Sequence, residues 1–235
     1  MKGKRGLIMG VANDHSIAWG IAKALYDQGA ELAFTYQGEG FGKRVRPLAE
    51  QLGSDIVIPC DVEDIDTVDA AFDVLAEKWG TIDFVVHAIG FSDRNELQGL
   101  YADTSRANFS RTMVISCFSF TEVAKRAAAL MTDGGSMITL TYAGSTRVMP
   151  NYNVMGIAKA GAGVKDAREM YNYQQKNSPL RRNVTIEDVG GSALYLLSNL
   201  SRGVTGEVHF VDSGYHVTSM PVLEELKPNG NGSKG

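Results

Sequence analysis

Cysteine is scarce in this sequence. The chain of 235 residues holds only Cys60 and Cys117, which stand far apart. A disulfide framework needs several cysteines, and a structural zinc site needs closely spaced Cys or His pairs, so we expect neither and predict no metal site. Each thiol is interpreted as a small apolar side chain of the core. The expected location is a reducing compartment, the cytoplasm.

Long apolar runs are absent as well. A membrane-spanning helix needs roughly 20 apolar residues in succession, and no such stretch occurs. Basic residues at the N-terminus precede an apolar run that is too short for the hydrophobic region of a signal peptide, and no cleavage signature follows. We therefore expect no membrane partner and no export.

An excess of positive charge is also missing. The formal net charge is −4, so nucleic-acid binding has no electrostatic support. With 44% hydrophobic and 21% charged residues, the composition is typical of a soluble globular protein with one large core. No internal repeat or linker marks a second domain, although the length alone permits two small ones.

Short apolar runs alternate along the chain with longer amphipathic runs. We predict strands at 5–11, 30–36, 55–62, 81–90, 135–144 and 206–214, and helices at 16–29, 43–53, 64–80, 104–131 and 185–199. Nearly continuous apolar strands that alternate with helices form a parallel sheet covered on both faces. The expected fold is an α/β, doubly wound, Rossmann-type single domain over residues 1–220, followed by a polar, Gly-rich tail at 221–235.

Such sheets bind ligands beside the carboxyl ends of their strands. After the first strand, Gly10 fits a tight turn, and Ser16 begins a helix whose amides can hold a pyrophosphate. The glycine pattern is not G-x-G-x-x-G, so a plain strand–helix turn is an equal alternative. After the fourth strand, Gly90 permits close approach of a ligand, whereas His87 is interpreted first as a core residue.

The second and third strands end in polar residues. Gln37 stands where a carboxylate would bind both ribose hydroxyls of NAD, and an amide neither demands nor rejects a 2′-phosphate. Lys43, Arg44 and Arg46 follow, and a solvated helix face is favoured for them over contact with such a phosphate. Asp61 either accepts a hydrogen bond from the adenine amino group or caps the next helix.

Two tyrosines and a lysine follow the fifth strand. Tyr152 and Lys159 are seven residues apart, about two helical turns and nearly one face, and Tyr142 precedes Tyr152 by ten. A phenol has an ordinary pKa of about 10, and a nearby ammonium favours its ionised form. The pair suits donation of a hydrogen bond or proton to an oxygen that gains charge during hydride transfer. Two unrelated helix-surface residues are the alternative.

These segments together resemble the short-chain dehydrogenase/reductase superfamily and, within it, the bacterial enoyl-acyl-carrier-protein reductases of type II fatty-acid synthesis. The carrying segments are GVANDHSIAWGIA (10–22), TYQG (35–38), CDV (60–62), HAIGF (87–91), TYAGSTRVMPNYNVMGIAKA (141–160), TIEDVGGSALYLLS (185–198) and TGEVHFVDSG (205–214). Most of the superfamily spaces Tyr and Lys four apart with a serine after the fifth strand. The enoyl reductases space them seven apart with an extra tyrosine, as this chain does.

The resemblance implies a nicotinamide cofactor along the carboxyl edge of the sheet. Its implied contacts are Gly10, Ser16 and Ile17 at the diphosphate, Gln37 at the adenosine ribose, Asp61 and Val62 at the adenine, Ile89 beside the cofactor, and Lys159 at the nicotinamide ribose. Gln37 within TYQG favours NADH over NADPH.

The resemblance also implies the reaction, which is hydride transfer to the β-carbon of a trans-2-enoyl thioester on acyl carrier protein. The implied catalytic set is Tyr142, Tyr152 and Lys159, with Tyr152 at the thioester oxygen and Tyr142 and Ser92 beside the acyl group. A homotetramer is implied by the family alone. Two other interpretations stay open: a carbonyl or alcohol dehydrogenase of the same fold, and a non-catalytic cofactor-sensing protein.

The sequence departs from this family after Ala160. Relatives continue the helix and add a sixth strand and a cofactor-covering loop, and nothing of this kind stands between Ala160 and Gly161. A true deletion would leave the predicted strand at 206–214 without a neighbour and its backbone groups unpaired. We therefore expect that residues between 160 and 161 are missing from the printed sequence.

A positively charged stretch follows this departure. Five basic residues face only two acidic ones there: Lys165, Arg168, Lys176, Arg181 and Arg182 against Asp166 and Glu169. One hypothesis makes this stretch part of the mouth that meets an acidic carrier protein. An ordinary charged helix is the alternative.

Overall fold

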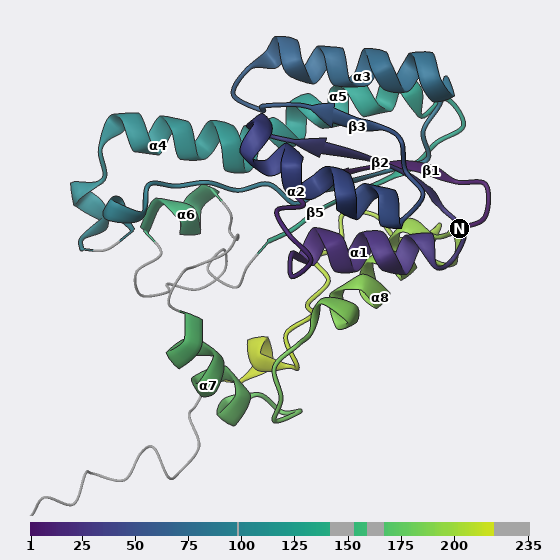
Figure 1. Ribbon diagram of the computed structural model, residues 1–235. Coiled ribbons are helices and arrows are strands. Elements are labelled where there is room, and N and C mark those ends of the chain that lie inside the picture. Colours follow the sequence, from purple (N-terminus) through teal and green to yellow (C-terminus); the bar gives the residue numbers. More distant parts are fainter. Residues whose placement is uncertain (98, 142–152, 159–166, 219–235) are drawn as a thin grey trace, which may run out of the picture. The chain divides into compact units, whose positions relative to one another are not determined.

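The computed structural model describes residues 1–97, 99–141, 153–158 and 167–218. Five parallel strands form one sheet in the order β3-β2-β1-β4-β5 (Figure 1). They are β1 (Arg5–Met9), β2 (Glu31–Tyr36), β3 (Val57–Pro59), β4 (Phe84–His87) and β5 (Ser136–Thr139). The chain winds outward from β1 in both directions, which confirms the predicted doubly wound fold. The carboxyl ends of β1 and β4 flank the switch point, where such sheets bind ligands.

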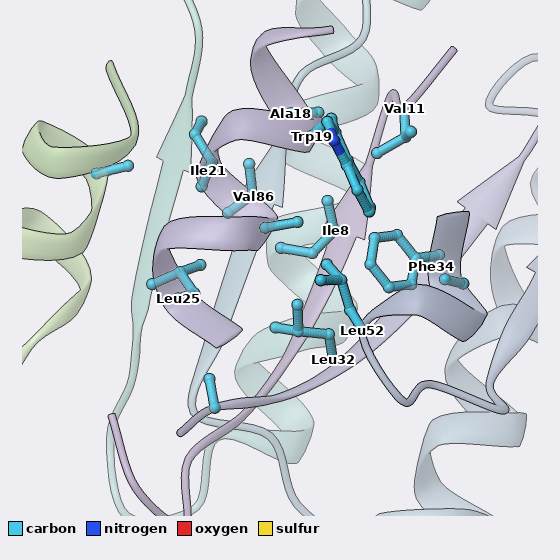
Figure 2. Packing of buried hydrophobic residues seen from close by; sticks show 14 of the residues in the cluster. Ile8, Val11, Ala18, Trp19, Ile21, Leu25, Leu32, Phe34, Leu52 and Val86 are labelled. Atoms are coloured by element: carbon cyan, nitrogen blue, oxygen red, sulfur yellow. The ribbon is translucent and has the colours of Figure 1, made fainter. Parts of the chain in front are cut away.

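The central strand β1 is buried on both faces. Leu7 and Met9 belong to one apolar cluster, and Ile8 belongs to the other, as the two-residue period of a strand requires. Ile8 pairs in register with Phe34 of β2 and with Val86 of β4. Figure 2 shows Ile8 and Val86 together with side chains from the neighbouring helix. The continuous apolar run of this strand therefore follows from its coverage by helices on both sides.

Eight α-helices lie within the described residues. They are α1 (Ile17–Tyr26), α2 (Gly38–Gln51), α3 (Ile65–Trp79), α4 (Arg106–Met113), α5 (Ser119–Leu130), α6 (Asn153–Ala158), α7 (Ala167–Asn177) and α8 (Ile186–Leu197). Apolar residues of α1, α2 and α8 share one cluster with the sheet, and those of α3 and α5 share the other. Figure 1 shows α3 and α5 together over one face of the sheet. A π-helix, η3 (Val114–Phe118), joins α4 to α5.

Two glycines let α1 and α8 approach each other closely. A Cβ on Gly20 would lie 2.6 Å from the carbonyl oxygen of Ile186, and a Cβ on Gly190 would lie 2.8 Å from the carbonyl oxygen of Gly20. Both sites are therefore closed to any larger residue unless a backbone moves. This contact fixes α1, and with it the turn after β1, against the body of the sheet.

The helices predicted at 16–29, 64–80, 104–131 and 185–199 are confirmed in position, with η3 inside the third of them. The helix predicted at 43–53 begins earlier, because α2 follows β2 after one intervening residue. The strands predicted at 55–62 and 81–90 are shorter than expected. Backbone pairing in β3 and β4 ends where their partners end.

The strand predicted at 206–214 is wrong. Residues 206–211 contain neither helix nor strand, and Val208 and Phe210 are 53% and 41% exposed. A strand needs a paired neighbour, and among the described strands β5 is the last of the sheet, bonded only to β4. β5 itself is only partly buried, whereas β4 is buried throughout.

Backbone contacts divide the chain into two compact units. One holds residues 1–163 and 186–205 and contains the sheet, and the other holds 164–185 and 206–235. Within the second unit, the Leu180 N–H donates to the Ser213 carbonyl at 3.3 Å. The rings of Tyr173 and Tyr215 meet edge to face, with 6.4 Å between centroids. Residues of α7 and of the loop after it therefore contact residues 213–215, at the end of the stretch that was expected to form the last strand.

Candidate functional site

The turn after β1 is tight and is held by hydrogen bonds within the loop. Gly10 has φ +97°, and a Cβ on it would lie 2.1 Å from the carbonyl oxygen of Ala88, so only glycine fits. The Ser16 hydroxyl accepts hydrogen bonds from the N–H groups of Ala12 and Asn13, each at 3.0 Å. These two bonds fold the loop onto the start of α1.

Ser16 is the N-cap residue of α1, but its side chain accepts no hydrogen bond from the first amides of the helix. Gln37, the N-cap residue of α2, likewise makes no side-chain cap. The next helix, α3, is different, because the Asp64 carboxylate accepts from the N–H of Asp66 at 3.2 Å. The uncapped amides of a helix N-terminus carry partial positive charge and bind phosphate well. The diphosphate of a dinucleotide therefore fits the turn between β1 and α1, where Ile17 is 42% exposed.

Gln37 and Asp61 meet across the ends of two neighbouring strands. The Gln37 amide Nε2 donates to Asp61 Oδ2 at 2.9 Å, and Asp61 Oδ1 accepts from the N–H of Glu63 at 3.0 Å. The N–H of Cys60 donates to the carbonyl of Tyr36 at 2.9 Å, which sets the two strand ends side by side. The structure thus brings together two residues that were predicted separately. Val62, which was predicted beside the adenine, is buried in an apolar cluster.

The first turns of α2 carry an ion pair that was not predicted. Arg46 donates from Nη1 to Glu39 Oε2 at 3.0 Å and from Nη2 to Glu39 Oε1 at 2.9 Å. Nη2 also donates to the Tyr36 hydroxyl at 2.5 Å, and the guanidinium lies 4.8 Å from the centre of that ring. The hydrogen bonds from Arg46 lower the pKa of the Glu39 carboxyl, so the pair is ionised at neutral pH.

The loop after β4, where Ile89 and Ser92 were predicted to contact ligand, is tied to the long helix. The Ser116 hydroxyl accepts from the N–H of Phe91 at 2.8 Å and donates to its carbonyl at 2.9 Å. Ser92 itself is partly buried, and its hydroxyl accepts from Thr112 Oγ1 at 3.1 Å. The π-helix that holds Ser116 widens one turn at this point, as such bulges often do beside functional sites.

Asn108 completes this attachment. Its side-chain oxygen accepts from the N–H of Asp93 at 3.0 Å, and the residue is only 6% exposed. Asn108, Thr112 and Ser116 were missed as site residues. Their signal was a row of polar residues at helical spacing on the face of a helix that is otherwise expected to bury apolar side chains.

His87 is a core residue, as expected. It is fully buried, its Nε2 lies 2.9 Å from Ser119 Oγ, and its Nδ1 lies 3.3 Å from Thr139 Oγ1. These contacts link β4, α5 and β5. His87 is the last residue of β4, directly before the loop that Ser116 and Asn108 bind.

The two cysteines differ in their exposure to solvent. Cys60 is buried, and burial raises the pKa of its thiol to about 11, in agreement with a role as core filler. The same interpretation is wrong for Cys117, which is exposed. Ile115 and Ser116 occupy the buried side of the π-helix, so the following residue points outward.

The expected catalytic residues Tyr142, Tyr152 and Lys159 lie outside the described residues. The helix α6 lies between the second and third of them. Asn153 at its start donates from Nδ2 to the carbonyl of Glu96 at 3.0 Å, and Met155 is buried.

In the described part of the chain, no group of three or more His, Cys, Asp or Glu side chains could hold a metal ion. In the same residues, no helix combines the length and apolar character needed to cross a membrane.

Known proteins match this chain along nearly its whole length. The family model described as enoyl-(acyl carrier protein) reductase matches residues 10–163 and 160–216. A relative from Rhizobium meliloti (strain 1021), enoyl-[acyl-carrier-protein] reductase [NADH] 2, is 67% identical over 259 residues that cover 97% of each chain.

Solved structures agree. The enoyl-(acyl-carrier-protein) reductase of Anaplasma phagocytophilum in complex with NAD has a TM-score of 0.92 and 53% identity, over 95% of this chain and 96% of that one. The Bacillus cereus enoyl-acyl carrier protein reductase with NADP+ and indole naphthyridinone has a TM-score of 0.90 and 42% identity, over 93% and 98%. The two structures carry cofactors that differ by a 2′-phosphate.

Proposed function

The chain belongs to the enoyl-acyl-carrier-protein reductase family, and from this membership we propose that it reduces the trans-2 double bond of enoyl thioesters on acyl carrier protein. The reaction is the last reductive step of the fatty-acid elongation cycle, and NADH is the reductant. The observation that carries this conclusion is the 67% identity to an NADH-dependent reductase over 97% of both chains.

The described residues fit the nucleotide half of the cofactor. The uncapped start of α1 beside Gly10 suits the diphosphate. Gln37 and Asp61 present amide and carboxylate oxygens at the ends of β2 and β3, where ribose and adenine are expected. When bound, the reduced nicotinamide supplies a hydride to the β-carbon of the substrate.

The catalytic set is proposed from the family pattern. Tyr152 donates a hydrogen bond to the thioester oxygen, which gains negative charge as the β-carbon is reduced. Lys159 binds the nicotinamide ribose and favours that charge electrostatically, and Tyr142 lines the pocket. A donor that meets charge only in the transition state accelerates the step rather than merely binding substrate. Protonation of the α-carbon then gives the saturated acyl group.

Acyl carrier protein is proposed to dock on the positively charged stretch around α7. Lys176 in the last turn of α7 is exposed, and so are Arg181 and Arg182, which follow the helix. Positive charges on one partner and negative charges on the other raise the rate of encounter. A homotetramer in the cytoplasm is proposed from the family alone, and analytical ultracentrifugation of the purified chain tests the assembly.

The chain is proposed to be one reductase domain over 1–220 from which residues after Ala160 are missing. Three observations support the omission. The family model matches in two stretches that meet at 160–163. The alignment with the Rhizobium relative runs over 259 residues, whereas this chain has 235, so that relative carries residues without a counterpart here. The stretch expected to form the last strand has none in the described residues. Mass spectrometry of the intact protein decides, because a mass near 25.4 kDa refutes the omission.

The function is tested by the absorbance of reduced nicotinamide in the presence of a crotonyl or longer enoyl thioester. We expect cofactor oxidation with the enoyl thioester and none with a ketone or aldehyde of similar size. Turnover of the carbonyl compounds alone would instead support a carbonyl reductase of this fold. Cofactor binding without any turnover would support a sensing protein.

A further inference from the structure

The family includes solved complexes with NAD and with NADP+, so the residues that choose between the two cofactors in this chain are an open question. The two differ only by a phosphate on the adenosine ribose. That ribose is proposed to lie beside Gln37, at the end of β2. A basic side chain near this point would favour NADPH, because arginine binds phosphate strongly.

Three basic residues follow Gln37 on α2, and their side chains make different contacts in the structure. The Arg44 guanidinium lies over the ring of Phe41, 4.7 Å from its centre. Lys43 is exposed and acts on Glu39 only through its charge. Arg46 is the one among these three that reaches back to the strand end, since it binds Tyr36, which precedes Gln37, and Glu39, which stands two residues after it.

The position of Arg46 is well determined by its surroundings. Nη1 donates to Glu39 Oε2 and Nη2 donates to Glu39 Oε1, and two such parallel bonds fix the orientation of the guanidinium relative to the carboxylate. Gly42 lies between the two partners, and a Cβ there would come within 2.7 Å of the Tyr36 ring and 3.1 Å of Arg46 Nη1. The absence of a side chain at Gly42 therefore makes room for the guanidinium over the ring.

We propose that the Glu39–Arg46 pair determines the preference of this chain for NADH over NADPH. Glu39 occupies the two donor directions that Arg46 would otherwise offer to a 2′-phosphate. It also adds a negative charge two residues beyond Gln37, which repels that phosphate. Glu39 and Arg46 are thus specificity-determining residues of the cofactor site. The inference rests on the proposed function, because it assumes a nicotinamide dinucleotide at the ends of β2 and β3.

Binding of two nucleotides that differ only by the 2′-phosphate tests this inference without any turnover. Adenosine 2′,5′-bisphosphate and 5′-AMP are titrated into the full chain by isothermal calorimetry. Glu39→Gln keeps the shape of the side chain and removes its charge. We expect this variant to bind the bisphosphate about tenfold more tightly than the unaltered chain does, with less than a roughly twofold change for 5′-AMP.

Two further variants separate the contribution of Arg46 from that of net charge. Combining Glu39→Gln with Arg46→Met should abolish the gain, because the released guanidinium provides it. Glu50→Gln removes the same charge from an exposed position of the same helix and should leave the ratio of the two affinities unchanged. The ratio of kcat/KM for NADPH and NADH should shift in the same direction as the binding ratio in each variant.

An unchanged ratio in Glu39→Gln would overturn the inference, and so would a gain that persists without Arg46. The inference would also be contradicted if neither nucleotide bound the unaltered chain or any variant, because the pair would then not lie beside a nucleotide site. The proposed function fails separately, when no variant oxidises NADH with an enoyl thioester although the two nucleotides bind as expected.

Discussion

Replacing Gly10 by alanine should damage both the fold and the cofactor site, for two separable reasons. At φ +97° an alanine costs about 1 kcal/mol relative to glycine. Its Cβ would also lie 2.1 Å from the oxygen and 2.6 Å from the carbon of the Ala88 carbonyl, which are backbone atoms. Overpacking of this kind costs about 1–3 kcal/mol. The expected loss is therefore about 2–4 kcal/mol in the free energy of unfolding.

A matched control isolates the clash from the backbone strain. Gly80, after α3, also has positive φ, at +73°, but a Cβ there meets nothing within 4 Å. Gly80→Ala should lose only about 1 kcal/mol. For a chain of this length, Gly10→Ala should lower the thermal midpoint by roughly 5–15 °C and Gly80→Ala by roughly 2–4 °C.

Circular dichroism during thermal and urea unfolding measures both losses, and calorimetry measures NADH binding. The Gly10 variant should bind NADH at least about tenfold more weakly, because the turn at the start of α1 can no longer close. The Gly80 variant should bind as the unaltered chain does. Equal destabilisation of the two variants, or unchanged NADH affinity in Gly10→Ala, would refute this account of the turn.

Three further predictions concern catalysis, thiol chemistry and carrier recognition. Tyr152→Phe should lower turnover at least about tenfold with an unchanged circular dichroism spectrum, and full activity would exclude the assigned role. A maleimide at neutral pH should label Cys117 and not Cys60, because burial raises the pKa of the Cys60 thiol. Peptide mass spectrometry identifies the labelled residue, and labelling of Cys60 in the folded chain would contradict its burial. Charge reversal at Arg168 and Lys176 should raise KM for carrier-linked substrate and not for a coenzyme A thioester, and equal effects on both would remove the docking hypothesis.

The sequence pattern predicted the structure correctly where the residues of a single helix or strand determine it. The apolar run around Leu7 and Ile8 could be assigned to a strand because coverage on both faces leaves no polar position. α3 was well predicted because its apolar residues recur at helical spacing between an Asp64 cap and Gly80. Gln37 and Asp61 were candidates only because each follows a strand, and parallel strands end at one edge of the sheet.

The sequence pattern did not predict the structure where contacts with a second helix or strand determine it. The residues around Val208 and Phe210 have the alternation of a strand, but no strand among the described residues is available to pair with them. Glu39 and Arg46 are two helical turns apart, but Arg46 also bonds Tyr36 of β2, and spacing along the helix does not indicate a contact with a strand residue. Cys117 is exposed because it directly follows Ile115 and Ser116, which occupy the buried side of the helix.

Transfer of labelled hydride tests the central claim most directly. NADH that carries deuterium at the transferable position of the nicotinamide is incubated with the chain and an enoyl thioester, and the acyl product is examined by mass spectrometry and NMR. The account predicts one deuterium at the β-carbon of a saturated acyl thioester. Deuterium on a carbinol carbon formed from a carbonyl group, or no transfer at all with cofactor bound, would contradict it.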